Sequence, residues 1–382
     1  MPTTDLLDGI SLVDDHCHGV TRHVEDRHAF ESFINEGPEE PPERMSHFDA
    51  PIGLTIRRWC APVLGLDPMA SAEDYVEARL KIGDEEATRT LLRAARLGSL
   101  LIDTGYRTDD SLDPGEMGAA AGAPAHEIVR IESVAEEIAA EAPSAADYSE
   151  RFAERLAERA AEAVGFKSVV AYRGGFGIDP SVPAGAEVTR AAGEWLRKLD
   201  GGRGARPRLE HPVLLRHGIW TAAAIAVEKK VPIQFHSGFG DTDLDIHLSN
   251  PSLLTGLVRR LGTLPVNVVF LHCYPYHREA GYLAAVFRNV YFDLGSVLNY
   301  VGPSVRNIQA EGLEIAPFTK QVFSTDAFGL PELYLAGAQT FRAALGEVLD
   351  GWVGEGRCTA ADAERIARLI GEENARRIYP ID

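Results

Sequence analysis

The sequence predicts an α/β fold, a (β/α)8 TIM-like barrel with helical insertions that cap its catalytic end. Eight short runs have the β-branched, apolar character of buried parallel strands, and helical stretches separate many of them. A doubly wound sheet would need a glycine-rich phosphate loop after its first strand, and none is present there. Because no internal repeat or low-complexity linker divides the 382 residues, we expect residues 1–382 to form a single barrel domain.

The eight predicted strands are spread along the chain. They are Ser11–His18, Leu100–Tyr106, Glu127–Ser133, Phe166–Tyr172, Pro232–His236, Val266–Cys273, Val290–Leu294 and Gln321–Asp326. In a closed barrel the carboxyl ends of all strands open on one rim, where the side chains that carry out chemistry gather. Residues at the ends of these runs are therefore the first candidates for a site.

The connections between the strands are uneven in length. The longest, residues 20–98, is predicted to be a helical cap insertion, with an amphipathic stretch at Ile52–Leu64 and a longer one at Ala72–Leu97. Ala135–Ala163 is predicted to be helical with a break near Pro143. Loops that grow over the rim of a barrel commonly cover its active site.

Two further regions complete the predicted architecture. The Gly, Pro and Arg content of Gly174–Pro212 predicts an irregular loop around a short helix at Glu187–Leu199. Residues 330–382 are predicted to form C-terminal helices that finish the outer coat of the barrel.

Composition and charge exclude several classes of function. The chain has 38 Lys and Arg against 57 Asp and Glu, a net charge of −19, which repels nucleic acid and anionic membrane surfaces. No apolar run is long enough to span a membrane, and Met1–Gly9 lacks the features of a signal peptide, so we expect a cytoplasmic protein. The expected partner is a small-molecule substrate, and the composition is compatible with either a monomer or a homo-oligomer. The four cysteines form no CxxC pair and are expected to be reduced thiols.

A His-x-His pattern closes the first predicted strand. Side chains two residues apart on a strand point to the same face, so His16 and His18 can reach one cation. Imidazole nitrogens bind zinc and similar divalent metals at about 2.0–2.1 Å. The competing interpretation is two ordinary histidines with no ligand.

A potential metal ligand is also the last residue of later predicted strands, or lies near their ends. His236 closes the fifth predicted strand, His272 the sixth, and Asp326 the eighth. The barrel topology brings these ends to the rim that also holds the first strand's histidines. We therefore expect one or two divalent ions, zinc first, with manganese or iron as alternatives that the same donors accept. The alternative is that each His bonds a backbone group and that Asp326 caps a turn.

At this point the sequence resembles the amidohydrolase superfamily, in which His-x-His on strand one, His on strands five and six, and Asp on strand eight bind metal. The stretches FKSVVAY, QFHSGFGDTDLDIHLSNP, LHCYPYHREAGYLA and FSTDAFGLPELY are similar to the nodulin-type amidohydrolase domain. In some proteins that domain is fused to a glutamine-synthetase-like domain. The resemblance implies hydrolysis of an amide or related C–N bond, such as a γ-glutamyl or other N-substituted amide.

The expected chemistry follows from a metal at the rim. The ion lowers the pKa of a bound water toward about 7 and polarises the scissile carbonyl. Asp326 accepts the proton of that water and returns it to the leaving nitrogen. The resemblance implies that Lys167, when carbamylated, bridges two metals, that Glu132 bridges them instead, or that there is no bridging residue. The alternative for Lys167 is a salt-bridged lysine whose side chain points away from the rim.

Three further polar residues are expected to contact substrate. Arg173, beyond the fourth strand, and Arg278, after the sixth, can each clamp a carboxylate with two hydrogen bonds. His277 can donate to the substrate carbonyl oxygen as a catalytic group, or can merely cap the helix that follows. Ion pairs with neighbouring acids are the alternative for both arginines.

Four acidic positions receive lesser roles. The run that contains Asp241 and Asp243 is expected to be loop, because its spacing does not fit a calcium site. Asp293, at the seventh strand, is expected to orient a ligating histidine. Asp103 ends no predicted strand and receives no role.

Two other functions remain open at this stage. Superfamily members with a single metal decarboxylate aromatic or unsaturated acids without oxidation, and metal counting would help to separate the two reactions. The second alternative is a metal-stabilised binding protein without catalysis. In that case Asp326→Asn would change metal content or melting temperature, and there would be no turnover for it to change. The complete ligand set argues against that second alternative.

Overall fold

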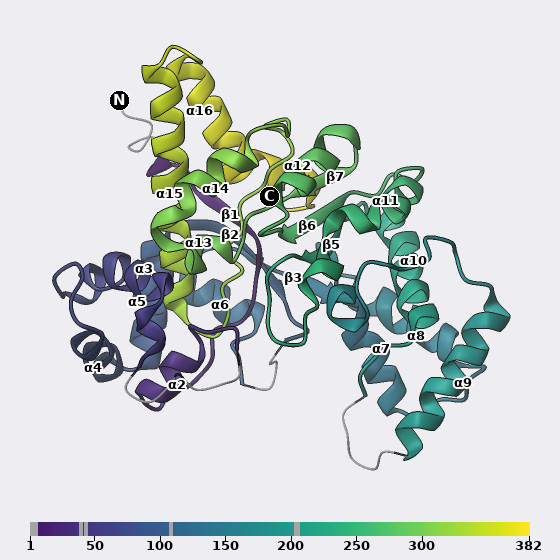
Figure 1. Ribbon diagram of the computed structural model, residues 1–382. Coiled ribbons are helices and arrows are strands. Elements are labelled where there is room, and N and C mark those ends of the chain that lie inside the picture. Colours follow the sequence, from purple (N-terminus) through teal and green to yellow (C-terminus); the bar gives the residue numbers. More distant parts are fainter. Residues whose placement is uncertain (1–6, 38–40, 42–44, 107–109, 202–206) are drawn as a thin grey trace.

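The computed structural model describes residues 7–37, 41, 45–106, 110–201 and 207–382. In this part of the chain, seven parallel strands form one sheet in sequence order, and its TIM-like curl is visible in Figure 1. The strands are β1 (Leu12–Cys17), β2 (Leu97–Asp103), β3 (Ala125–Arg130), β4 (Gly165–Ser168), β5 (Ile233–Ser237), β6 (Val268–His272) and β7 (Val290–Phe292). The predicted α/β, TIM-like fold class is confirmed.

The eighth predicted strand, Gln321–Asp326, lies between β7 and β1 but is not a regular strand. On one side, the backbone of Phe292 bonds to both neighbours of Gln321, at 3.1 and 3.0 Å. On the other side, the amide of Asp326 donates to the carbonyl of His16 at 3.0 Å. The segment therefore occupies the eighth position of the barrel and connects the two edges of the sheet.

A buried side chain explains why this segment departs from strand geometry. The carboxylate of Asp14 accepts hydrogen bonds from the backbone amide and the hydroxyl of Thr325, at 2.9 and 2.6 Å. The next residue, Asp326, has a φ of +49°, in the left-handed region that strands do not use. The expectation of a regular eighth strand is corrected to an irregular segment whose path is fixed by Asp14.

Two strand boundaries also differ from the prediction. The second strand begins and ends three residues earlier than expected, so Asp103 is its last residue. The expectation that Asp103 ends no strand was wrong. The third strand ends at Arg130, and α7 begins at once with Ile131, which places Glu132 in the first turn of a helix. A helical start can follow a strand without a loop, and hydrophobic periodicity cannot locate that change.

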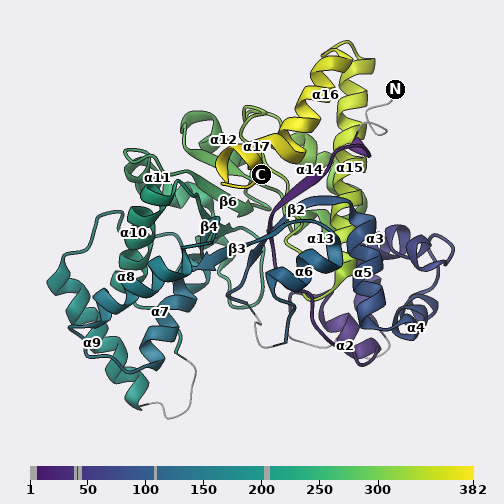
Figure 2. The same cartoon turned by 180° about the vertical axis from the view of Figure 1, so that it is seen from behind.

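The insertion after β1 contains four α-helices in its described part. Its helices are α2 (Arg27–Ser32), α3 (Pro51–Trp59), α4 (Ala72–Ile82) and α5 (Asp84–Ala95). The last two are separated by Gly83, whose φ of +79° suits glycine. Helices α3 and α5 pack against α15 (Pro331–Gly354), at the side of the barrel (Figures 1 and 2). Within the described part of this insertion, the residues that line the cavities at the rim lie between Arg27 and His47.

The remaining helices surround the sheet. They are α6 (Pro114–Ala121), α7 (Ile131–Ala140), α8 (Tyr148–Arg159), α9 (Gly185–Gly201), α10 (Pro212–Lys229), α11 (Thr255–Leu261), α12 (His277–Val286), α13 (Val297–Tyr300), α14 (Val305–Gly312), α16 (Ala360–Arg368) and α17 (Asn374–Ile378). The predicted break near Pro143 is present between α7 and α8. Within the described residues, we find no helix with the length and apolar character needed to cross a membrane.

The C-terminal segment seals the interior of the barrel. Ala375 and Ile378 of α17, together with Tyr379, pack against inward-facing residues such as Val13 and Leu101. The Tyr379 hydroxyl is 2.9 Å from a carboxylate oxygen of Asp15, deep in the barrel. Because this end is closed, the open mouth of the barrel is the opposite end, where the strands terminate.

Candidate metal centre

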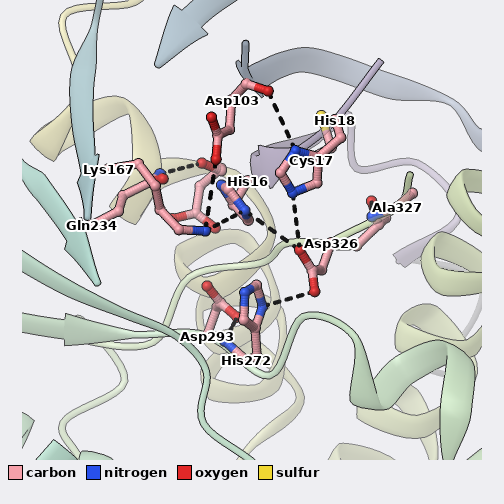
Figure 3. A network of polar contacts seen from close by, with 12 residues as sticks. His16, Cys17, His18, Asp103, Lys167, Gln234, His272, Asp293, Asp326 and Ala327 are labelled. Carbon is pink, nitrogen blue, oxygen red and sulfur yellow. Dashed lines mark hydrogen bonds and ion pairs between the residues drawn. The ribbon is translucent and has the colours of Figure 1, made fainter. Parts of the chain in front are cut away.

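Three potential metal ligands meet at the end of β1. His16 belongs to β1 and His18 follows it, and both side chains face Asp326 (Figure 3). Their Nε2 atoms lie 3.4 and 3.7 Å from Oδ1 of Asp326. One ligand atom from each of the three residues fits within 4.8 Å of the others. This spacing matches a group that can share one cation.

The two other predicted ligands lie beside this group. The ring centroids of His236, in β5, and His272, at the end of β6, are 4.7 Å apart. His272 Nδ1 is 3.2 Å from Oδ2 of Asp326, and its ring centroid is 5.3 Å from that of His16. Side chains from β1, β5, β6 and the eighth segment therefore gather at one point.

The unpaired atoms of the site fit a metal ion. Nε2 of His236 and Nε2 of His272 are buried without a hydrogen-bond partner among the described residues. Buried polar nitrogens are rarely left unpaired, because each costs free energy comparable to a lost hydrogen bond. His18 Nδ1 is 3.3 Å from the carbonyl oxygen of Asp103, which favours the tautomer whose Nε2 is free to bind metal.

Two of the candidate ligands stand on strained backbone. His272 and Asp326 have φ values of +66° and +49°, a region that costs non-glycine residues about 1–3 kcal/mol. Close by, a Cβ on Gly295 would lie 2.6 Å from Nδ1 of His272, so glycine is required there. Such strain persists where the surrounding structure holds side chains in a functional position.

Burial keeps the four histidines neutral. It lowers the pKa of His18 to about 3 and lowers the pKa values of His16, His236 and His272 well below the ordinary value. The charge of Lys167 acts in the same direction on His16 and His236. Neutral imidazole is the form that binds a metal, so the site is prepared for a cation without loss of protons from these rings.

Lys167 points into the cluster. From β4, its Nζ lies 2.8 Å from Nε2 of His16 and 4.0 Å from a carboxylate oxygen of Asp103. Burial lowers the pKa of Lys167 to about 8, against the opposing charge of Asp103. Burial also raises the pKa of Asp326 to about 7, and the Lys167 charge opposes that rise. The alternative in which Lys167 points away from the rim does not apply.

Sequence reasoning missed an ion pair that supports the site. Asp103 accepts a hydrogen bond of 2.6 Å from Arg130, at the end of β3. Burial alone would raise the pKa of Asp103, but the charges of Arg130, His18 and Lys167 hold it well below the ordinary value. A second strand placed three residues earlier would have put Asp103 at the rim and identified it as a residue of the site.

A second carboxylate positions a ligand through the backbone. Asp293, directly after β7, accepts a hydrogen bond of 2.7 Å from the backbone amide of His272. The expectation that Asp293 orients a histidine is therefore met through the main chain, and its carboxylate does not bond the imidazole. Asp14 acts similarly, because its bonds to Thr325 fix the residue that precedes Asp326.

A chamber of about 270 Å³ opens over the cluster. His18, Lys167, His236 and Asp326 line it together with Arg173, which follows β4. The Arg173 side chain is only 10% exposed and lies 3.1 Å from Glu136, but its Nε and Nη1 have no hydrogen-bond partner among the described residues. Arg173 therefore lines the chamber, and its pairing with Glu136 is the alternative that was considered for it, so a substrate contact stays a prediction.

The other predicted contacts lie outside this chamber. Glu132, on α7, accepts a hydrogen bond of 2.6 Å from Ser168 and is not part of the ligand group. His277 begins α12 and sits 2.7 Å from Glu311 on α14. Arg278 is 56% exposed and pairs with Glu314 at 2.9 Å. For Arg278, the structure shows the ion pair that was the alternative interpretation. His277 is the first residue of α12 and contacts Glu311, which is neither the substrate contact nor the helix cap considered for it.

A TIM-like barrel with histidine and carboxylate ligands at its strand ends defines a metal-binding enzyme fold. A model of the amidohydrolase family matches residues 106–381, so the chain belongs to that family. Protein fluG of Emericella nidulans is 36% identical over 226 residues, 57% of this chain. The chain spans about a quarter of the length of that relative, because the match covers 26% of it.

Solved structures agree with this assignment. A candidate metal-dependent hydrolase from Lactobacillus casei superposes with a TM-score of 0.86 at 26% identity, covering 99% of this chain and 97% of that one. Glucuronate isomerase from Caulobacter crescentus gives a TM-score of 0.67 at 15% identity, with coverage of 100% and 93%. The second likeness shows the fold alone.

Proposed function

We propose that this chain hydrolyses an amide or a related C–N bond in a small molecule, using a divalent ion at the candidate metal centre. The observation that carries this proposal is the convergence of His16, His18 and Asp326 within 4.8 Å at the mouth of the barrel. His236 and His272 stand beside them with unpaired nitrogens. Zinc suits this donor set best, and manganese and iron accept the same ligands. Membership of the amidohydrolase family and the likeness to the Lactobacillus casei protein support the reaction class.

The roles of the protein groups follow from their positions. A divalent ion, when bound, supplies a water of lowered pKa and polarises the substrate carbonyl. Asp326 lines the chamber and can accept the proton of the attacking water, then return it to the leaving nitrogen. His16 and His18 are both buried at the end of β1, so their imidazoles have fixed positions beside the carboxylate of Asp326.

Arg173 is proposed to bind a carboxylate of the substrate. Arg173 lines a chamber of about 270 Å³, and two of its nitrogens are buried without a hydrogen-bond partner among the described residues. A planar guanidinium can grip a carboxylate with two parallel hydrogen bonds. An N-substituted amide that carries a carboxylate on its acyl half, such as a γ-glutamyl amide, fits this arrangement.

Lys167 is proposed to belong to the metal centre, and its carbamate would add a carboxylate ligand. The support is its direct contact with His16 and its burial beside Asp103. Glu132 is not proposed as a bridge, because its carboxylate bonds to Ser168.

The test is hydrolysis by the purified full chain before and after metal removal. We expect turnover of carboxylate-bearing amides in a panel of amides, esters and lactams, its loss on chelation, and its return with zinc or manganese. Asp326→Asn should lower kcat by about 100-fold or more while the chain stays folded by circular dichroism. Release of CO2 from carboxylated acids without amide hydrolysis would instead show a decarboxylase. Stoichiometric metal with no turnover of any substrate would indicate a binding protein.

A further inference from the structure

A second cavity adjoins the chamber over the metal centre. It has a volume of about 790 Å³, and its wall includes residues of α2 and the chain after it. The two cavities share the lining residues Glu36, Tyr106, Asp241, Asp243 and Phe328. These five residues, which we term the boundary, separate an inner chamber at the metal centre from a larger outer compartment.

The boundary carries three carboxylates, Glu36, Asp241 and Asp243, and only Asp243 forms an ion pair within the described residues. Asp243 is paired with Arg208, at 3.2 Å. Glu36 and Asp241, in contrast, form no ion pair with any basic side chain in the described ranges. Glu36 is half-buried, and burial together with the charge of Asp326 raises its pKa to about 7. A carboxyl group whose ionised form is disfavoured by burial and by a neighbouring negative charge is typical of a functional site.

Among the described residues that line the outer compartment, the one arginine is already paired. This arginine, Arg27, is engaged by Glu31 and by Glu73, each at 2.6 Å. The ring of His47 bonds to the carbonyl oxygen of Glu31 at 2.8 Å. The acids of the boundary therefore face a compartment whose arginine is already paired.

Arginines line the inner chamber, and Arg208, which pairs with Asp243, is one of them. Arg130 and Arg173 both line it, and the charges that act on Arg173 are those of Glu136, Arg208, Glu132 and Arg130. The charges that act on Glu36 are those of Asp326 and Asp241. The principal charges that act on Arg173 thus differ from those that act on Glu36, although both side chains line the chamber.

Unpaired buried atoms indicate that a ligand fills the inner chamber. The Arg173 side chain is nine-tenths buried, with Nε and Nη1 unpaired among the described residues. The hydroxyl of Ser296, 2% exposed, also lines the chamber without a partner in that part of the chain. A substrate anchored by its carboxylate at Arg173 would extend past the metal centre toward the boundary.

We propose that Glu36 and Asp241 form a cation-binding subsite that selects amides whose leaving amine carries a second, positively charged group. The acyl half then occupies the inner chamber, and the amine half passes the boundary into the outer compartment. The bond to the leaving nitrogen lies between Arg173 and Glu36, above His18 and Asp326. This inference names the substrate class of the proposed hydrolase and rests on that function.

The kinetic test compares two substrates that share a carboxylate-bearing acyl group. One is an N-(aminoalkyl) amide, and in the other a methyl group replaces the terminal ammonium. At about pH 8, where both Glu36 and an alkyl ammonium are charged, the metal-loaded wild type should prefer the first by about tenfold in kcat/KM. Glu36→Gln and Asp241→Asn should each reduce this preference and leave the methyl substrate within about twofold of wild type.

A matched control and a binding assay keep the outcomes distinct. Glu162→Gln makes the same change of charge at an exposed residue that lines neither cavity, and it should preserve the preference. Calorimetric titration with a linear alkane diamine, against the alcohol of equal length, needs no turnover and should show binding that weakens in Glu36→Gln.

The possible failures differ from one another. Equal kcat/KM for the two amides, or a preference that persists in both boundary variants, overturns the subsite while the hydrolase stands. Diamine binding that depends on Glu36, without hydrolysis of any amide, supports the subsite and overturns the proposed reaction. Absence of both diamine binding and preference overturns the subsite.

Discussion

Nζ of Lys167 lies 2.8 Å from Nε2 of His16, so a lysine of β4 touches a candidate metal ligand of β1. Both side chains are almost fully buried, and Asp103 and Asp326 are the carboxylates whose charges act most strongly on the lysine. A lysine held in this place cannot be a solvated surface charge. Through its contact with His16, a side chain of the fourth strand is part of the candidate metal centre (Figure 3).

Replacement of Lys167 should therefore disturb the metal centre. We expect Lys167→Ala to lower both the metal content and kcat/KM by about 10- to 100-fold, since it removes a direct neighbour of a ligand. Propionate should restore part of the activity, because its carboxylate replaces that of a lysine carbamate. Lys81→Ala, at an exposed position on α4, is the matched control. Normal metal content and activity in Lys167→Ala would contradict the role given to this lysine.

Arg173 should contribute to substrate binding in a way that Arg278 does not. Arg173→Met should lower kcat/KM for a carboxylate-bearing amide by about 10- to 100-fold, mainly through KM, because charge-assisted hydrogen bonds are lost. An amide without the carboxylate should be affected little. Arg278→Met is the control, since Arg278 pairs with Glu314 outside the chamber. Similar effects of the two variants would argue against a carboxylate site at Arg173.

The Asp103–Arg130 pair should matter for stability as well as for the site. Asp103 is fully buried, and its loss would leave Arg130 without its compensating charge. Asp103→Asn should lower the free energy of unfolding by about 3 kcal/mol, measured by urea denaturation. It should also weaken metal binding, because the carboxylate that stands 4.0 Å from Lys167 in the cluster is lost. The exposed pair Arg22–Glu116 offers a contrast, because Glu116→Gln should change stability little. An unaltered urea midpoint in Asp103→Asn would refute this expectation.

Glu36 should make the metal-free protein less stable at high pH. Its pKa is about 7 in the folded chain against 4.5 ordinarily, so between these values only the unfolded chain releases the proton. Stability is therefore lost as pH rises from 4.5 to 7, at up to about 1.4 kcal/mol per pH unit, which partial exposure reduces. At pH 8, Glu36→Gln should be about 1–2 kcal/mol more stable than wild type, and the gain should vanish near pH 4.5. A pH-independent difference between the two melting curves would exclude this linkage.

The repeated histidines explain why much of the metal centre could be predicted from sequence. His236 and His272 each close an apolar run, and a parallel barrel brings such ends together whatever their separation along the chain. The pattern therefore predicted the parallel strands and the ends that carry His16, His236 and His272, although two strand boundaries and the eighth strand needed correction. It could not show that the eighth segment is irregular, because that depends on the bonds between Asp14 and Thr325.

Residues outside the strand ends were harder to predict. Glu36 comes from an insertion whose path over the rim has no local signature, and its partners are distant in sequence. Arg130 was missed because the third strand ends there and a helix starts at the next residue. His277 was expected at the substrate, but α12 begins with it and turns its side chain toward Glu311. Such contacts depend on packing between helices, which periodicity does not encode.

The central claim is tested most directly by anomalous diffraction from crystals of the chain purified without chelator. We predict a peak at the absorption edge of zinc, manganese or iron, within about 2.0–2.2 Å of Nε2 of His16, Nε2 of His18 and an oxygen of Asp326. A map without any peak among these three side chains, from protein whose metal content is near zero and whose activity resists chelation, would contradict the account.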